Sequence, residues 1–256
     1  MYPEINIGPL TLQTFGLCFG LGFVVAGAVI ARRLVEWKKP PDWAYEIAFA
    51  ALAGGLVGAR LYYVLDNLDT TGDDLFGSIF SGTGLTWYGG AIGGAIGVVG
   101  WARWRGMLSL RLLDLCAVPL AIGYAIGRVG CQLSGDGDYG EPWDGPWAMA
   151  YPEGTVATDV PVHPTPVYET LAMGTAAIFL WGLRDRFRPG VLFALYLLFA
   201  GIERFLVEFV RRNPDVALGL TQAQWLSVAM VAIGGVWFFS QWRRGPGARQ
   251  RPLPAS

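Results

Sequence analysis

Three arginines, Arg60, Arg128 and Arg204, lie within long apolar stretches of the sequence. A guanidinium group is planar and donates two parallel hydrogen bonds, so arginine suits the binding of a phosphate or a carboxylate. A charged side chain within a membrane is costly and usually faces a polar cavity. The three arginines are therefore the first candidates for an anion-binding site.

Other reactive side chains lie near the ends of the same stretches: Tyr88, His163, Glu169, Glu203 and Glu208. A tyrosine or a histidine can act as a general base, so Tyr88 and His163 are both candidates for proton transfer. His163 also has a structural interpretation, because it precedes Pro164 and could position the helix that follows. Glu169 and Glu208 are better suited to orient arginines than to move protons.

Metal and disulfide chemistry find little support in the sequence. The only histidine is His163, and the cysteines Cys18, Cys116 and Cys131 all lie in apolar stretches without a CxxC motif. A structural zinc site needs several such ligands, and a disulfide scaffold needs paired cysteines. We therefore expect no bound metal, no disulfide and no cofactor.

The composition is that of a membrane protein. Of 256 residues, 53% are hydrophobic and only 15% are charged, whereas a soluble domain has about 25% charged residues. The mean hydropathy is +0.40. This apolar content excludes a disordered chain. The formal net charge of −1 offers no basic face for a nucleic acid.

Seven apolar stretches approach the roughly 20 residues that a membrane-spanning helix needs. They cover residues 11–31, 43–65, 85–101, 112–133, 165–183, 191–210 and 222–239. We therefore predict an all-α, polytopic membrane protein with seven transmembrane helices in a single domain, residues 1–256. The first ten residues contain Glu4 and no basic residue, so the first stretch is not expected to be a cleavable signal peptide.

Charged residues alternate between the segments that join these stretches. Fourteen of the 19 lysines and arginines follow stretches one, three, five and seven, and twelve of the 20 acids lie in the opposite segments. Cytoplasmic loops are enriched in basic residues. The N-terminus and Asp144 are therefore expected outside, and Arg105, Arg186 and the C-terminus in the cytoplasm.

The three arginines lie at one predicted depth. They belong to stretches two, four and six, which all run outward, and at 1.5 Å rise per residue each lies about 8–9 Å below the outer boundary. A single such arginine could simply extend to the lipid head groups. Three at one depth favour an electropositive pocket that opens to the outer leaflet, where lipid phosphates lie.

The glycines are predicted to have two roles, close packing of helices and unwinding of a helix. Gly-x-x-x-Gly pairs, which let helices pack closely in lipid, are Gly16/Gly20, Gly54/Gly58, Gly90/Gly94 and Gly93/Gly97. The glycine-rich residues 127–140 instead predict that the fourth helix unwinds beside Arg128. No strand precedes this segment and no GK[ST] follows it, so it is not a P-loop. Residues 134–164 are predicted to form an external loop, with Trp143, Trp147 and Tyr151, that could act as a lid or cap.

Five motifs together resemble those of the prolipoprotein diacylglyceryl transferases, a family of bacterial seven-helix membrane enzymes. They follow the family's order over nearly the whole chain. The motifs are Gly58-Ala-Arg60-Leu-Tyr-Tyr, Tyr88-Gly89-Gly90, Gly127-Arg128-Val-Gly130, His163-Pro164-Thr-Pro-Val-Tyr168-Glu169 and Arg204-Phe-Leu-Val-Glu208-Phe-Val-Arg211.

The resemblance implies transfer of the diacylglyceryl group of phosphatidylglycerol to the lipobox cysteine of a preprolipoprotein, with release of glycerol phosphate. It implies that Arg128 binds phosphatidylglycerol and that Arg204, paired with Glu208, is a second functional arginine. The expected location is the bacterial cytoplasmic (inner) membrane, with the site facing the outer leaflet of the bilayer, and we expect a monomer.

Two sets of site residues follow from these interpretations. The candidate catalytic residues are Arg128, Arg204, Tyr88, His163 and Glu208. The candidate substrate-binding residues are Arg128, Arg60, Gly89, Gly130, Glu169 and Arg211.

Three positions depart from the pattern of the family. Tyr88 stands where many members have histidine, Cys131 where many have asparagine, and Phe15 where a tyrosine is frequent. The ordinary pKa of tyrosine, near 10, makes Tyr88 a poor substitute for a compulsory histidine base. A divergent paralogue that binds or transfers lipid to another acceptor therefore stays an alternative.

Two other classes of protein fit parts of the pattern. A transporter of an anionic substrate would also line a cavity with arginine, but near the bilayer midplane and often between internal repeats. Here the charges lie near one face, and the sequence shows no repeat. A protease using Ser134 and His163 is disfavoured because two acids, Asp136 and Asp138, lie where an oxyanion hole would need donors.

Overall fold

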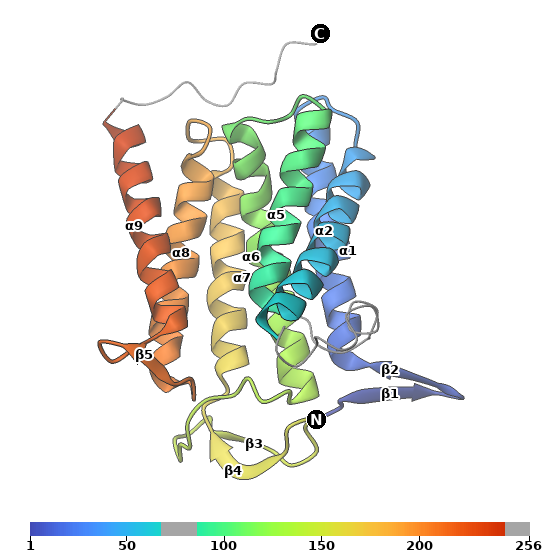
Figure 1. The fold of residues 1–256 in the computed structure, drawn as a ribbon, viewed down its shortest axis with the longest axis vertical. Coiled ribbons are helices and arrows are strands. Elements are labelled where there is room, and N and C mark those ends of the chain that lie inside the picture. The colour runs from blue at the N-terminus through green and yellow to red at the C-terminus, as the bar shows by residue number, and fades with distance from the viewer. Residues whose placement is uncertain (68–85, 244–256) are drawn as a thin grey trace. The chain divides into compact units, whose positions relative to one another are not determined.

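A computed structural model describes residues 1–67 and 86–243 of the chain, which are predominantly helical (Figure 1). Within these residues there are seven α-helices, one short 3-10 helix and six short strands. The mostly helical fold agrees with the prediction. Some residues used for the predicted topology lie outside this part of the chain: Asp69, Asp73, Asp74, Arg244, Arg249 and Arg251.

The chain forms two compact units. One, the site unit, consists of Met1–Ile30 and Leu113–Ser256, and the other, the glycine unit, consists of Ala31–Leu112. Helices α1 (Thr14–Glu36) and α6 (Leu110–Ser134) lie mainly in the site unit.

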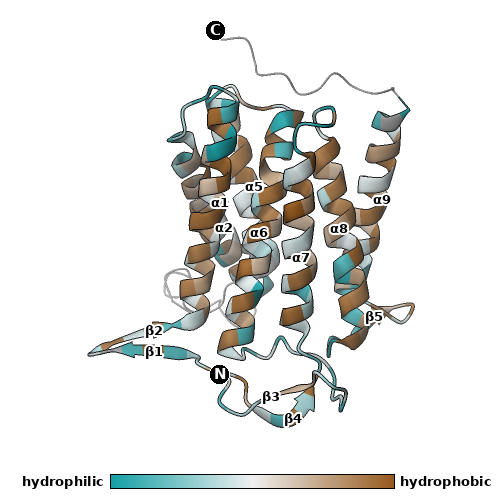
Figure 2. Ribbon diagram, turned by 180° about the vertical axis from the view of Figure 1, so that it is seen from behind, coloured by the Kyte–Doolittle hydropathy of each residue, from teal (hydrophilic) through white to brown (hydrophobic). Residues whose placement is uncertain are grey.

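Helices α6, α7 (Thr165–Leu183) and α8 (Val191–Val207) provide the core of the site unit. Most of its buried side chains are small, and they include Ala117, Ala121, Ala125, Ala176 and Ala177. Small residues let helix backbones approach closely where lipid gives no hydrophobic drive for association. Helix α9 (Gln222–Trp242) packs along α8, and Figure 2 shows the apolar character of these helices.

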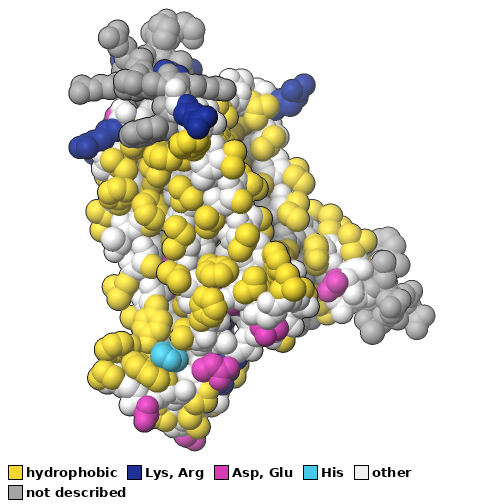
Figure 3. Space-filling model, turned by 90° about the vertical axis from the view of Figure 1, so that its left-hand side faces the viewer, with side chains coloured by type: hydrophobic (Ala, Val, Ile, Leu, Met, Phe, Trp, Pro, Cys, Tyr) yellow, Lys and Arg dark blue, Asp and Glu magenta, His cyan; other side chains and the backbone are white. Residues whose placement is uncertain are grey.

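Four of the described helices are long and apolar enough to cross a membrane: Thr14–Glu36, Trp43–Asp66, Leu110–Ser134 and Gln222–Gln241. Helices α5 (Trp87–Trp104), α7 and α8 coincide with predicted stretches. They have 18, 19 and 17 residues and are shorter than the four helices above. Hydrophobic side chains predominate on the face shown in Figure 3. Largely exposed residues such as Ile178 on α7 and Val236 on α9 suit contact with lipid.

Three antiparallel hairpins were not predicted. They are β1 (Glu4–Ile7) with β2 (Leu10–Gln13), β3 (Met149–Tyr151) with β4 (Thr158–Val162), and β5 (Asp215–Ala217) with β6 (Leu220–Thr221). Strands this short carry little alternation of polar and apolar residues, so the sequence pattern does not reveal them.

The hairpin β3–β4 belongs to the predicted external loop, residues 134–164, which is called the cap below. The cap has a small core of its own, made by Tyr139, Tyr151 and Val162. The rings of Tyr139 and Tyr151 stack with their centroids 4.8 Å apart. The predicted loop is therefore a folded segment.

One prediction about α6 is wrong. The helix does not unwind beside Arg128 but continues to Ser134, and the N–H of Gly135 donates to the Cys131 carbonyl at 2.9 Å. Gly135 has a φ of +59°, a left-handed conformation that favours glycine at the end of a helix. Of the glycines beside Arg128, Gly130 packs closely against α1, as described below, whereas a Cβ on Gly127 would meet no described atom within 4 Å.

In the glycine unit, α2 (Trp43–Asp66) packs closely against α5. A Cβ atom on any of five glycines would collide with backbone atoms of the facing helix, and these are Gly54, Gly58, Gly89, Gly93 and Gly97. The predicted packing role is confirmed for Gly54/Gly58 and Gly93/Gly97. It is not found for Gly16/Gly20 in α1, since a Cβ on Gly20 would meet no described atom within 4 Å.

Replacing Gly93 with alanine should destabilise the protein. The new methyl group would collide with the Gly54 carbonyl and lie 2.8 Å from the Gly58 Cα, and neither backbone atom can turn aside. Overpacking costs about 1–3 kcal/mol, so the thermal unfolding midpoint in detergent should fall by several degrees. Gly100→Ala on the same helix is the control, because its Cβ would meet no described atom within 4 Å. Equal midpoints for the two variants would contradict this packing.

Candidate functional site

The carboxylate of Glu169 is at the centre of the site. Glu169 lies one turn into α7, which begins with Thr165 and Pro166, and its side chain is fully buried. Its Oε1 accepts hydrogen bonds from the Tyr124 hydroxyl at 2.8 Å and from Arg204 Nη1 at 3.0 Å. Its Oε2 lies 3.0 Å from Arg128 Nε. Two of the predicted arginines thus share one of the predicted glutamates.

A second buried carboxylate, that of Glu208, holds Arg204 from the other side. Arg204 lies in the last turn of α8 and Glu208 begins the 3-10 helix η1 (Glu208–Val210), so the two face each other at i, i+4. Glu208 Oε2 lies 2.8 Å from Arg204 Nη2. Its Oε1 accepts from Asn213 Nδ2 at 2.6 Å and from Thr221 Oγ1 at 2.8 Å. Glu208 therefore orients Arg204, as the sequence predicts.

Asp138, at the start of the cap, bridges two arginines. One carboxylate oxygen contacts Arg128 Nη1, and the other accepts from Arg211 Nη2 at 2.6 Å. The backbone carbonyl of Asp138 also accepts from Thr165 Oγ1 at 2.6 Å and from Arg211 Nη1 at 3.1 Å. These bonds attach the cap to the first turn of α7 and to the end of η1.

The Asp138 carboxyl is ionised at neutral pH. Burial alone would raise its pKa, but the guanidinium groups of Arg128 and Arg211 outweigh burial and hold the pKa of this carboxyl below its ordinary value. The same carboxylate, together with Glu169, raises the pKa of Arg211 against the opposing effect of burial. Asp138 and the two arginines therefore form ion pairs, with both partners charged.

Positive and negative groups balance within this cluster, which consists of Arg128, Arg204, Arg211, Asp138, Glu169 and Glu208. The structure thus differs from the bare electropositive pocket expected from the sequence. Glu169 and Glu208 have fully buried side chains, whereas the Asp138 side chain is 35% exposed. Asp138 is therefore the partner that an incoming anion can displace at the lowest cost.

His163 lies in the cap, just before α7. Its ring stacks on Trp143, with centroids 4.4 Å apart and planes 11° apart. Its Nδ1 is 3.2 Å from the Tyr168 hydroxyl, which also accepts a hydrogen bond from Trp147 Nε1 at 2.8 Å. Nδ1 of neutral His163 accepts from this hydroxyl in one tautomer and donates to it in the other. These contacts satisfy the structural interpretation and leave Nε2 for another partner.

Three predicted site residues, Arg60, Tyr88 and Gly89, lie in the glycine unit. Arg60 is buried on α2, with its guanidinium carbon 5.3 Å from the centre of the Tyr63 ring. Tyr88 is half-buried in the first turn of α5. A Cβ on Gly89 would collide with the Gly58 carbonyl, so close packing already explains a glycine there.

Gly130, also predicted to bind substrate, packs against α1. A Cβ at this position would lie 2.9 Å from the Cys18 Cβ and 3.5 Å from the Phe15 Cα. Cys131, the next residue, has its Sγ 3.7 Å from both Arg128 Nη1 and Asp138 Oδ2. Two positions that depart from the family's pattern, Phe15 and Cys131, therefore lie next to the segment that carries Arg128.

Sequence reasoning missed Asp138 and Tyr124 as members of the site. The sequence identifies Asp138 as one of the acids of the outer segments and as an argument against a protease, and no helical spacing relates it to Arg128, ten residues earlier. Tyr124 lies one turn before Arg128 on α6, and the Arg128 guanidinium carbon is 5.0 Å from its ring centre. The i, i+4 spacing from Tyr124 to Arg128 was the available signal.

Among the described residues, one group of side chains could approach a metal ion: Cys131, Asp136 and Asp138, whose ligand atoms lie within 4.8 Å of one another. Arg128 and Arg211 both contact the Asp138 carboxylate. Their positive charges oppose a cation at this point. The same charges favour an anion, and two guanidinium groups converging on one carboxylate can bind a phosphate through charge-assisted hydrogen bonds.

Comparison with known proteins gives a consistent match over the chain. A family model described as prolipoprotein diacylglyceryl transferase matches residues 4–240. The phosphatidylglycerol–prolipoprotein diacylglyceryl transferase of Erythrobacter litoralis (strain HTCC2594) is 31% identical, over 99% of this chain and 94% of that protein. The protein of the same name from Pseudomonas fluorescens (strain Pf0-1) is 31% identical, over 98% of each. The chain therefore belongs to the prolipoprotein diacylglyceryl transferase family.

Proposed function

We propose that this protein transfers the diacylglyceryl group of phosphatidylglycerol to the lipobox cysteine of a prolipoprotein, the first step of bacterial lipoprotein maturation. The observation that carries the proposal is the pair of guanidinium groups, Arg128 and Arg211, that share the partly exposed carboxylate of Asp138. A phosphodiester presents one negative charge and two free oxygens, as a carboxylate does. It can therefore take the place of Asp138 between the two arginines.

The proposed reaction forms one bond and breaks one. The cysteine thiolate attacks the carbon of the diacylglyceryl group that carries the phosphate ester, and a thioether forms as the bond between this carbon and the phosphate oxygen breaks. Glycerol phosphate leaves with the bonding electron pair, and the thiol proton passes to a base. A free thiol is only slightly ionised at pH 7, so a base or a cationic surrounding promotes the attack.

Arg128 and Arg204 are assigned the leading electrostatic role. They would hold the phosphate and offset the negative charge that builds on it as the leaving group departs, which is often the largest contribution to catalysis. Glu169 and Glu208 keep these guanidinium groups in place through the contacts given above. We assign Arg211 and Arg60 to phosphate binding as well.

Two candidates for the base are retained. Histidine is the side chain best suited to proton transfer near neutral pH. His163 Nε2 would accept the thiol proton in the tautomer whose Nδ1 carries the hydrogen and donates it to the Tyr168 hydroxyl, 3.2 Å away. Tyr88 would need a strongly lowered pKa to act as a base. The structural features around His163 therefore favour it over Tyr88.

The proposed topology has seven spans, with the N-terminus outside and the C-terminus in the cytoplasm. It is supported by four helices of sufficient length and by the position of basic residues after stretches one, three, five and seven. The arginine cluster and the cap would then face the outer leaflet of the inner membrane. We propose that the protein acts there as a monomer.

Purified protein in detergent should add a diacylglyceryl mass to a lipobox peptide when phosphatidylglycerol is supplied. Peptide mass and released glycerol phosphate are followed together, and a Cys→Ser peptide is the control because it lacks the thiol nucleophile. Phosphatidylglycerol binding without transfer to any lipobox peptide would contradict the proposed reaction. It would support a paralogue with another acceptor.

Arg128→Lys should lower the transfer rate by about 100-fold or more, because a lysine cannot reproduce the two parallel hydrogen bonds of a guanidinium group. Arg128→Ala should abolish transfer and also reduce stability, since it removes a partner of buried Glu169. Rates are measured at saturating phosphatidylglycerol, on protein whose detergent unfolding midpoint has been checked. Full activity of a folded Arg128→Lys protein would mean that local positive charge suffices.

Single-cysteine variants should reveal the proposed topology. A cysteine at Asp144 in the cap should react with an impermeant thiol reagent added to intact spheroplasts. Cysteines at Arg105 and Arg186 should react only after the membrane is opened. The native cysteines are replaced first, so that labelling reports one position. Labelling at Arg186 but not at Asp144 in sealed spheroplasts would reverse the orientation.

A further inference from the structure

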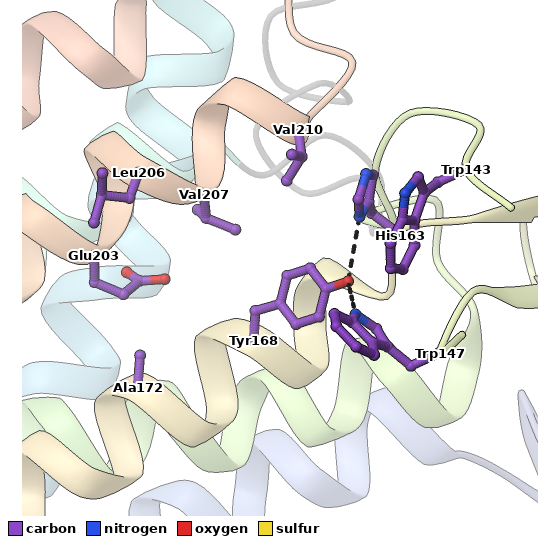
Figure 4. A pocket seen from close by; sticks show the side chains of 9 residues that line it. All are labelled: Trp143, Trp147, His163, Tyr168, Ala172, Glu203, Leu206, Val207 and Val210. Atoms are coloured by element: carbon purple, nitrogen blue, oxygen red, sulfur yellow. Dashed lines mark hydrogen bonds between the residues drawn. The ribbon is translucent and has the colours of Figure 1, made fainter. Parts of the chain in front are cut away.

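Next to the arginine cluster the site unit contains a cavity of about 490 Å³ (Figure 4). This volume lies within the ~300–1,000 Å³ that small ligand sites occupy. Four rings line one part of the cavity, and aliphatic side chains of α7, α8 and η1 line the other. The lining residues are Trp143, Trp147, His163, Tyr168, Ala172, Glu203, Leu206, Val207 and Val210.

Glu203 is the exception in this apolar lining. Its carboxylate points into the cavity in Figure 4. Its Oε1 atom is buried and has no hydrogen-bond partner among the described residues. A buried acceptor without a donor is unfavourable. The cavity therefore suits an occupant that is mostly apolar but brings at least one hydrogen-bond donor.

The cavity and the arginine cluster lie on neighbouring faces of the same helices. Along α8 and η1 the cavity is lined at Glu203, Leu206, Val207 and Val210, which is the i, i+3, i+4, i+7 spacing of one helix face. Each of three cluster residues, Arg204, Glu208 and Arg211, directly follows one of these lining residues. On α7, Tyr168 lines the cavity and Glu169 belongs to the cluster. A ligand in the cavity therefore lies beside the proposed phosphate site.

We infer that this cavity receives the acceptor peptide, as an apolar segment in extended conformation whose backbone N–H groups face Glu203. The inference rests on the proposed function, because it gives the second substrate a place beside the first. An extended peptide supplies apolar side chains for the rings and N–H donors for the carboxylate. A lipid acyl chain offers no donor and would leave Glu203 Oε1 unpaired. A free glycerol head group offers donors but no apolar surface for the rings.

The position of His163 agrees with this assignment. Its ring forms part of the cavity wall, and its Nδ1 is 3.2 Å from the Tyr168 hydroxyl. A peptide cysteine in the cavity would therefore have a candidate base beside it and the arginine cluster on the neighbouring helix face.

The test fills the cavity without touching the charge cluster. Ala172→Phe places a ring in the cavity, whereas Leu171→Phe adds a ring at the neighbouring position, which is largely exposed and does not line the cavity. We expect Ala172→Phe to raise the KM for a lipobox peptide at least tenfold and to change the KM for phosphatidylglycerol less than twofold. Leu171→Phe should leave both constants near their wild-type values.

Two substitutions of Glu203 test the role of its carboxylate. Glu203→Gln keeps an acceptor oxygen and should raise the peptide KM less than threefold, whereas Glu203→Leu removes the acceptor and should raise it at least tenfold. Unfolding midpoints in detergent are compared first, so that only folded variants enter the comparison.

Binding of the fluorescent Cys→Ser peptide is measured in parallel, because binding does not depend on transfer. Wild-type protein that binds this peptide but transfers nothing to the cysteine form would contradict the proposed function, and weaker binding by Ala172→Phe would still support the cavity assignment. An increase in the phosphatidylglycerol KM alone for Ala172→Phe would overturn the assignment and favour an acyl chain as the occupant. Unchanged peptide binding in both Ala172→Phe and Glu203→Leu would also overturn it.

Discussion

The structure of the site unit depends on the buried charge of Glu169. A carboxylate taken out of water is stable only when cations and hydrogen bonds surround it closely. Here Tyr124 and Arg128 on α6 and Arg204 on α8 surround Glu169, which α7 contributes. Because removing one partner of a buried ion pair typically costs about 3–5 kcal/mol, these three helices are held in one arrangement at this level. The position of each arginine is thus set by folding, before any substrate binds.

Charge balance in the cluster resolves a difficulty that any anion site in a membrane protein faces. Arginines left without counterions would be unstable in a surrounding of low dielectric constant, yet arginines paired too firmly would not bind a substrate. In this cluster, different acids meet the two requirements. Glu169 and Glu208 are fully buried on regular helical elements, while Asp138 belongs to the cap and keeps about a third of its side chain exposed. Asp138 is therefore the acid of the cluster that the proposed function requires a phosphate to displace.

Much of this arrangement could be read from the sequence, because its determinants are local. Apolar stretches predicted the seven helices of the described residues, and the resemblance to the family implied the pairing of Arg204 with Glu208. The equal depth of Arg60, Arg128 and Arg204 predicted one shared pocket. Arg128 and Arg204 meet at Glu169, whereas Arg60 belongs to the glycine unit. The contact of Asp138 with Arg128 could not be derived from the sequence, since it depends on how the cap folds back over α7. The three short hairpins could not be predicted either, because they show no periodic pattern. The glycines around Arg128 misled for a physical reason. Glycine is compatible with unwinding, with close packing and with an ordinary helical position. Gly130 packs against α1, and Gly127 has an ordinary helical position with no close neighbour.

One face of α8 lines the cavity, and the neighbouring face contributes to the arginine cluster. Successive residues on a helix point about 100° apart, so Glu203 and Arg204, or Val207 and Glu208, serve neighbouring compartments from one rigid element. On α7 the consecutive residues Tyr168 and Glu169 do the same. Groups that bind an apolar ligand and groups that hold a phosphate are then fixed relative to each other by helix geometry, without an intervening flexible loop. Bringing two reactants into a fixed relation can supply about 7–11 kcal/mol of a reaction barrier. A membrane enzyme that joins a lipid to a peptide therefore gains most from residues placed side by side on the same helix.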